Sequence, residues 1–177
     1  MATGRGTLLL NSAAFVRTRF GEEGQRRVLA AIPDVARHFS GSGSLPEGAR
    51  IPLEHLILYM TTARSLLAPE AADFYREMGR FSAAQESKGG LAHIVSDRET
   101  LVKMLRTLWR AYFDSGSFEV VEKDGNSFTG RVVDFEGHAA LCERISGVAD
   151  AHFRTAHVEH VACVFRGDAR CDWKVRW

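Results

Sequence analysis

The sequence predicts an α+β protein in which a helical N-terminal half packs on a mostly antiparallel sheet. Apolar residues recur with helical spacing as far as about residue 113, and from residue 117 they alternate with the period of a strand. Two turn signals, Asp124-Gly125-Asn126 and Arg166-Gly167-Asp168, divide the C-terminal half into hairpins around one helical segment, in the order ββαββ. The chain has 177 residues, so we expect a single domain over residues 1–177.

The first fifty residues have a broken helical pattern. Helical spacing covers residues 12–32, with Gly21 interrupting it and Pro33 ending it. Asp34 is suited to cap a further short turn. A Gly/Ser-rich stretch at residues 41–46 is then expected to be a loop, too short to separate two domains.

Three longer helices are expected to follow. Pro52 suits the first residue of a helix that continues to Leu67, and the next helix follows Pro69 and ends before the glycine pair at residues 89–90. Ser96 and Glu99 have the spacing of a capping box, which opens the clearest helix of the chain. This helix is expected to continue to about residue 113.

The C-terminal half is expected to contain strands at 117–122 and 127–135, a helix at 138–153, and strands at 155–165 and 169–177. In the last strand, basic residues alternate with apolar ones. That alternation predicts an edge strand with one solvated face.

Composition excludes several classes of function. Lys and Arg number 23 against 22 Asp and Glu, so no strong field attracts nucleic acid, and we expect no nucleic-acid partner. No apolar run approaches the roughly 20 residues of a membrane span, and we expect a cytoplasmic protein with reduced thiols. Neither a nucleophile elbow nor a Gly-rich phosphate loop is present, so we do not expect an enzyme.

The cysteines and one histidine of the C-terminal quarter form a candidate metal site. A three-residue loop in the last hairpin would place Cys163 opposite Cys171, and Cys142 lies on the preceding helix. His160 would complete four zinc ligands, but on a regular strand it points away from Cys163, so either a bulge is needed or Glu159 takes its place. Packed inert thiols, a structural zinc ion and a redox or disulfide role all remain open.

The run from Cys163 to Trp173 resembles the closing signature of the 4-vinyl reductase domain, in which a cysteine, a Gly-Asp turn and a second cysteine end the last hairpin. Cys142 and the stretch 147–149 fit the same pattern. The whole chain, with its segments 15–21 and 51–53, is also similar to an uncharacterised myxobacterial family of about this length.

The resemblance implies a fold shared with TRAPP components and haem nitric-oxide-binding domains. It also implies a sensory or signalling domain for a hydrophobic or aromatic small molecule, and a homodimer formed through the helical half. In phenol-sensing relatives, a zinc ion is held by three cysteines and an acid. By position Cys142, Cys163 and Cys171 match those cysteines, and His160 stands in the place of the acid.

We expect a ligand pocket between the helical layer and the sheet. Haem is not expected, because His138, His152 and His157 have no distinctive motif around them. The alternative function is a protein–protein assembly module with a filled interior. The residues expected to line the pocket, all of which could equally belong to the core, are Leu56, Met60, Phe74, Met78, Leu105, Trp109 and Phe113.

Overall fold

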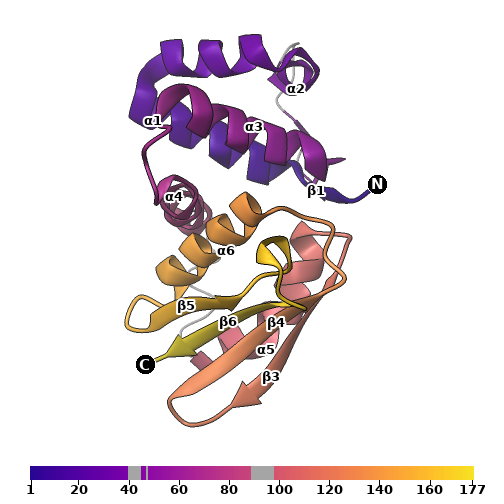
Figure 1. Cartoon of the computed structure of the whole chain (residues 1–177), viewed down its shortest axis with the longest axis vertical. Coiled ribbons are helices and arrows are strands. Elements are labelled where there is room, and N and C mark those ends of the chain that lie inside the picture. The colour runs from indigo at the N-terminus through magenta and orange to yellow at the C-terminus, as the bar shows by residue number, and fades with distance from the viewer. Residues whose placement is uncertain (40–44, 47, 89–97) are drawn as a thin grey trace.

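The computed structural model describes residues 1–39, 45–46, 48–88 and 98–177, and it confirms the α+β class (Figure 1). In chain order the helices and strands are β1 (Thr3–Arg5), α1 (Gly6–Ala31), α2 (Pro33–Ala36), a 3₁₀ turn (Arg37–Phe39), β2 (Arg50–Pro52), α3 (Leu53–Leu67), α4 (Phe74–Lys88), α5 (Arg98–Tyr112), β3 (Ser117–Lys123), β4 (Ser127–Val133), α6 (Ala139–His152), β5 (His157–Ala162), a second 3₁₀ turn (Val164–Arg166) and β6 (Cys171–Arg176).

The expected helices are present, with several differences in the first fifty residues. The first helix begins at Gly6 rather than at residue 12, and Asp34 lies within α2, whose N-cap is Ile32. The break at Gly21 is a kink inside one long helix, α1, because Gly21 adopts φ 72°, which side-chain-bearing residues rarely adopt. The short strands β1 and β2, which the sequence did not predict, pair with each other beside α1. The expected loop at 41–44, the glycine pair 89–90 and the capping residue Ser96 lie outside the described residues.

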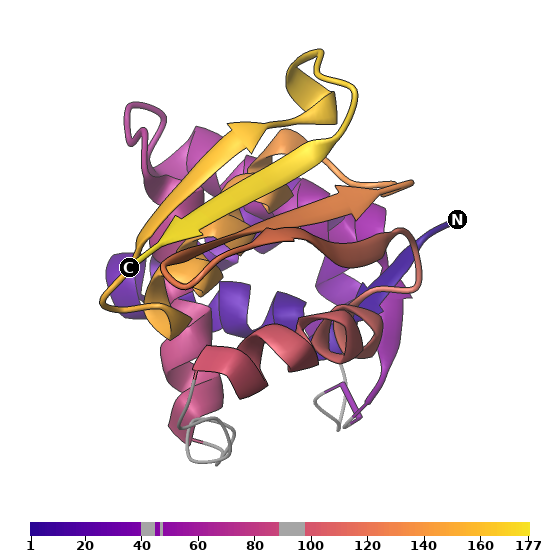
Figure 2. The ribbon, with the colours of Figure 1, turned by 90° about the horizontal axis from the view of Figure 1, so that it is seen from below.

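The C-terminal strands form an antiparallel sheet in the order β3-β4-β6-β5 (Figures 1 and 2). The prediction that the last strand lies at an edge is wrong, because β6 pairs with both β4 and β5. Its buried Cys171, Trp173 and Val175 are consistent with that inner position. No helix in the described part of the chain is both long and apolar enough to cross a bilayer.

α6 lies between α4 and the sheet, and glycines allow it to approach α4 closely (Figure 1). A Cβ atom on Gly147 would lie 1.9 Å from the carbonyl oxygen of Arg76, and one on Gly79 would lie 2.0 Å from that of Arg144. Arg76 also donates two hydrogen bonds of 2.7 Å to the carboxylate of Asp150. α6 is therefore held in a fixed position, and its opposite face borders the site described next.

Candidate functional site

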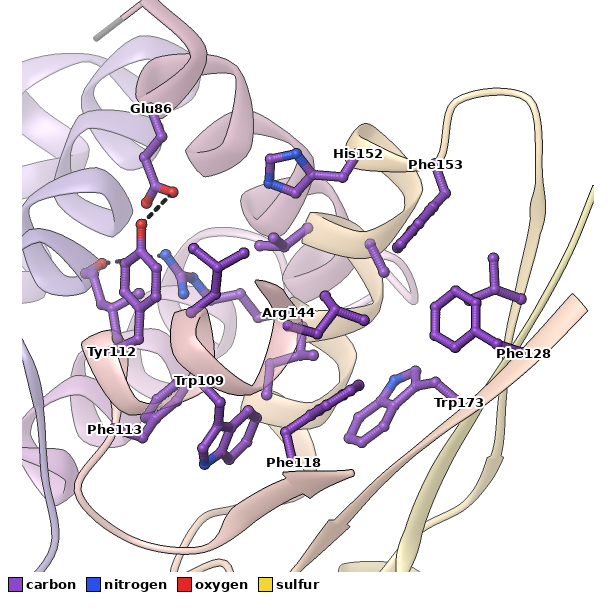
Figure 3. A pocket seen from close by; sticks show the side chains of 17 residues that line it. Glu86, Trp109, Tyr112, Phe113, Phe118, Phe128, Arg144, His152, Phe153 and Trp173 are labelled. Carbon is purple, nitrogen blue, oxygen red and sulfur yellow. Dashed lines mark hydrogen bonds between the residues drawn. The ribbon is translucent and has the colours of Figure 1, made fainter. Parts of the chain in front are cut away.

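A cavity of about 150 Å³ lies where α5, α6 and the four-stranded sheet meet (Figure 3). Aromatic and aliphatic side chains form most of its wall, and in size it matches an engineered apolar cavity known to bind benzene. The lining residues are Leu8, Glu86, Leu105, Leu108, Trp109, Tyr112, Phe113, Phe118, Phe128, Arg144, Ile145, Val148, Ala149, His152, Phe153, Trp173 and Val175.

Arg144 is the most deeply buried polar residue of this wall, with only 1% of its surface exposed. Its Nη2 donates to Ser82 Oγ at 2.8 Å and, more weakly, to the carbonyl oxygen of Leu8 at 3.5 Å. Its Nε has no hydrogen-bond partner among the described residues. Burial lowers the pKa of Arg144 to about 10, so the guanidinium is still charged at neutral pH.

Glu86 and Tyr112 lie at the same end of the cavity as the Arg144 guanidinium (Figure 3). The Tyr112 hydroxyl donates to Glu86 Oε2 at 2.7 Å, and Asn11 Nδ2 donates to Oε1 at 3.2 Å. Burial, reinforced by Glu86, raises the pKa of the Tyr112 hydroxyl. His152 is the remaining ionisable residue of the wall; the residue as a whole is exposed, yet burial lowers the pKa of its imidazole.

The structure divides the residues expected to line a pocket into two groups. Leu105, Trp109 and Phe113 do line the cavity. The other four are fully buried elsewhere in the core: Leu56, Met60, Phe74 and Met78. Sequence reasoning missed Arg144 and the wall from the sheet, although an arginine beside the apolar face of the helix at 138–153 was a detectable signal.

The ligand atoms of Cys142, His160, Cys163 and Cys171 lie within 4.8 Å of one another, in a second site. All three cysteines are free thiols, and the Sγ atoms of Cys142 and Cys171 are 3.9 Å apart. Two thiolates at tetrahedral positions on one zinc ion, with Zn–S bonds of about 2.3 Å, are about 3.8 Å apart. The spacing of this pair therefore suits zinc.

The backbone around the last hairpin explains how His160 joins the cysteines. A shift in register lies between His160 and Ala162, the kind of irregularity that the sequence analysis required. Glu159 is exposed and pairs with Arg176 at 3.2 Å, away from the cluster.

The expected three-residue loop at residues 166–168 is wrong. Residues 164–166 form a 3₁₀ turn, and the connection between the strands covers 163–170. The Asp168 carboxylate accepts a hydrogen bond of 2.7 Å from the amide of Cys163, which stabilises the longer connection.

Two features of the cluster favour a bound cation. His160 Nε2 is buried without a hydrogen-bond partner in the described part of the chain, while Nδ1 lies 3.5 Å from Glu143 Oε1 and 2.9 Å from Arg166 Nη2. Hydrogen bonding from Cys142 lowers the pKa of Cys171, and the amide of Val164 also donates to this sulfur at 3.4 Å. A thiolate is the form of cysteine that binds metal.

No protein-family profile matches the chain, and no curated protein matches its sequence. Its fold is that of solved H-NOX domains. An H-NOX protein from S. oneidensis in the Fe(II) state shares 12% identity at a TM-score of 0.72, over 97% of this chain and 95% of that one. An oxygen-binding H-NOX domain related to soluble guanylate cyclases shares 12% identity at a TM-score of 0.68, over 97% and 94%. At these identities the likeness establishes a common fold.

The expectation that haem is absent is wrong for this fold. Another structure with the same fold, at 10% identity, a TM-score of 0.66 and coverage of 98% of this chain and 99% of that one, is described by its haem redox potential and porphyrin distortion. The expectation rested on missing motifs around three histidines, and a missing local motif does not exclude a cofactor held by residues from separate elements.

The cavity wall contains chemistry that suits haem. His152 has an imidazole that could ligate iron, Arg144 has a guanidinium that could pair with a propionate, and the remaining wall is mostly apolar. The other two histidines considered lie outside the wall, since His138 caps α6 by accepting from the amide of Ala140 and His157 is exposed on β5. A porphyrin has four pyrrole rings and is several times larger than the single ring that about 150 Å³ holds, so haem does not fit the cavity as described unless its wall opens.

Proposed function

We propose that this chain is a small-molecule-binding sensory domain rather than an enzyme, and that its ligand occupies the cavity between α5, α6 and the sheet. The observation that carries the proposal is the cavity itself, which is apolar, opens to the surface and has few polar groups, as small-ligand sites typically do. Such a site discriminates by shape and by the few polar groups that orient the ligand.

Two ligand classes have separate support. The H-NOX neighbours support haem, with a small gas as the sensed molecule, because they are described as haem and oxygen-binding domains. The cavity volume supports a free molecule about the size of one aromatic ring. The resemblance of the C-terminal residues to the 4-vinyl reductase domain supports the second class as well.

Binding experiments on the purified chain test the proposal. Titration with haemin should give a sharpened Soret band, which His152→Ala should shift or weaken if His152 ligates the iron. A thermal-shift screen with hydrophobic and aromatic compounds should raise Tm as the ligand concentration increases. If neither haemin nor any compound binds and light scattering shows a dimer, the assembly-module alternative replaces the sensory function.

We also propose that Cys142, His160, Cys163 and Cys171 hold one structural zinc ion. Support comes from the compact donor set, the unpartnered His160 Nε2 and the hydrogen bond to the Cys171 sulfur. When bound, zinc would join α6 to both ends of the 163–170 connection. With Nε2 on the metal, Nδ1 would carry the ring proton and donate to Glu143 Oε1, now 3.5 Å away, and the Arg166 guanidinium, now 2.9 Å from Nδ1, would have to move aside.

Elemental analysis of protein purified without added metal tests this second proposal. We expect about one zinc per chain, and a loss of that zinc in Cys171→Ser. Metal-free protein with three titratable thiols would contradict the zinc site and leave the cavity proposal unaffected.

A further inference from the structure

The Arg144 guanidinium is a feature of the cavity that a purely apolar ligand leaves unexplained. It lies in a wall made mainly of carbon, with 1% of the residue exposed. Removing a charge from water is costly unless an opposite charge or a full set of hydrogen bonds replaces the water. An apolar ligand would leave the buried Nε donor of Arg144 without a partner.

The partners of Arg144 within the chain do not supply that replacement. A guanidinium has five N–H donors. Ser82 and Leu8 both accept from Nη2 and both are neutral, whereas Nε has no partner. Among the residues that the structure describes, none forms an ion pair with Arg144.

Glu86, the acid at this end of the cavity, already accepts hydrogen bonds from other residues. Each of its carboxylate oxygens accepts a hydrogen bond, one from Tyr112 and one from Asn11. Glu86 balances part of the charge through space without satisfying the free Nε donor.

We propose that the ligand of this cavity is an amphipathic acid, whose carboxylate binds the Arg144 guanidinium and whose apolar body packs against Trp109, Phe118 and Trp173. The proposal rests on the proposed function and deepens it by naming the ligand class. Guanidinium and carboxylate groups match in planar geometry and can form two parallel hydrogen bonds. Haem, through its propionates, and a free aromatic carboxylic acid both have this chemistry.

Matched pairs of compounds test the proposal on the unmodified protein. Phenylacetate is compared with phenylacetamide, indole-3-acetate with indole-3-acetamide, and haemin with its dimethyl ester, each by calorimetry or fluorescence titration at pH 7. Within a pair the apolar body is nearly constant, so the ratio of the two dissociation constants isolates the carboxylate. We expect at least one acid to bind about tenfold or more tightly than its neutral partner.

Four variants show whether Arg144 causes that preference. Arg144→Gln should bring the ratio of acid to neutral affinity close to one, whereas Arg144→Lys should retain part of it. Arg37→Gln makes the same change of residue at an exposed arginine outside the cavity wall, so it serves as the matched control and should leave the ratio unchanged. Glu86→Gln removes the competing negative charge and should increase the ratio.

The outcomes separate this inference from the proposed function. If neutral and acidic partners bind equally to the unmodified protein, the acid proposal is overturned and the cavity remains a binding site. If no compound of either kind binds, both are overturned. Preference within the haemin pair alone identifies haem as the source of the carboxylate, and preference within the small pairs identifies a free acid. If Arg144→Gln does not fold, the pairs on the unmodified protein still decide.

Discussion

Replacement of Gly147 by alanine tests the helix crossing that positions the cavity wall. The added Cβ would lie 1.9 Å from the carbonyl oxygen of Arg76, whereas ordinary contacts begin at 3.4 Å, so α4 and α6 would have to separate by about 1.5 Å at this point. They are not free to separate, because Arg76 also binds Asp150 and donates to the carbonyl oxygen of Val158 at 2.9 Å.

The expected loss of stability follows from two opposing effects. Overpacking typically costs about 1–3 kcal/mol, and a clash between backbone atoms belongs at the upper end of that range. Alanine recovers about 1 kcal/mol through its helix propensity. We expect a net loss of about 2 kcal/mol in the free energy of unfolding, and a fall of about 4–8 °C in Tm for a chain of this length.

Urea denaturation followed by circular dichroism, with a thermal melt as a second measurement, would determine both quantities. Gly125→Ala is the matched control, since a Cβ atom there meets nothing within 4 Å. It should leave the stability nearly unchanged. A Gly147→Ala protein as stable as the control would refute the close crossing of α4 and α6, and with it the placement of Arg144 at the cavity.

Three further predictions concern the cavity, the cysteine cluster and pH. Ala149→Leu adds three carbons that fill part of the cavity, so it should raise the free energy of unfolding by up to about 2 kcal/mol. It should also abolish the ligand-induced shifts in Tm. If those shifts persist undiminished, the ligand binds elsewhere. Chelation of zinc, or Cys171→Ser, should lower Tm and change the fluorescence of Trp173, whose ring stacks on His160 at 4.5 Å, and an unchanged spectrum would argue against metal at His160. Burial, together with the neighbouring ring of His55 at 2.8 Å, lowers the pKa of His38 below 6.5. As the pH falls below about 6.5, this histidine therefore binds a proton in the unfolded chain before it does so in the folded one, and the free energy of unfolding should decrease. The urea midpoint at pH 8 and pH 5.5 measures this slope, which His55→Gln should reduce; an equal slope in that variant would contradict the assignment.

Local patterns predicted the elements of the C-terminal half but not their order in the sheet. The alternation at 169–177 correctly indicated a strand, and its basic residues suggested a solvated edge. The strand order depends instead on where β5 lies after α6. In the structure β5 is the edge strand, and β6 lies between β5 and β4. β1 and β2 have three residues each, which is too short for a periodic signal.

The two sites differ in how far the sequence could reveal them. The four residues of the cysteine cluster come from one helix and the hairpin that follows it, so hairpin geometry and cysteine spacing could propose the set together. The cavity wall combines Leu8, Glu86 and Phe118 with α6, from elements distant in the sequence. Spacing within one element cannot indicate such a meeting point, which is why the helical pattern led to core residues such as Phe74 as well as to wall residues such as Trp109.

α6 connects these findings, because different faces of its 14 residues serve different partners. Cys142 points to the hairpin cluster, Arg144 borders the cavity, and Gly147 with Asp150 holds α4. On the sheet, Trp173 contacts both sites, because it lines the cavity and its ring stacks on His160. Its Nε1 also donates a hydrogen bond of 2.9 Å to Ser146 Oγ of α6. A ligand that moves Trp173 or α6 must therefore change the environment of the cysteine cluster, and metal in the cluster must in turn restrict the cavity wall.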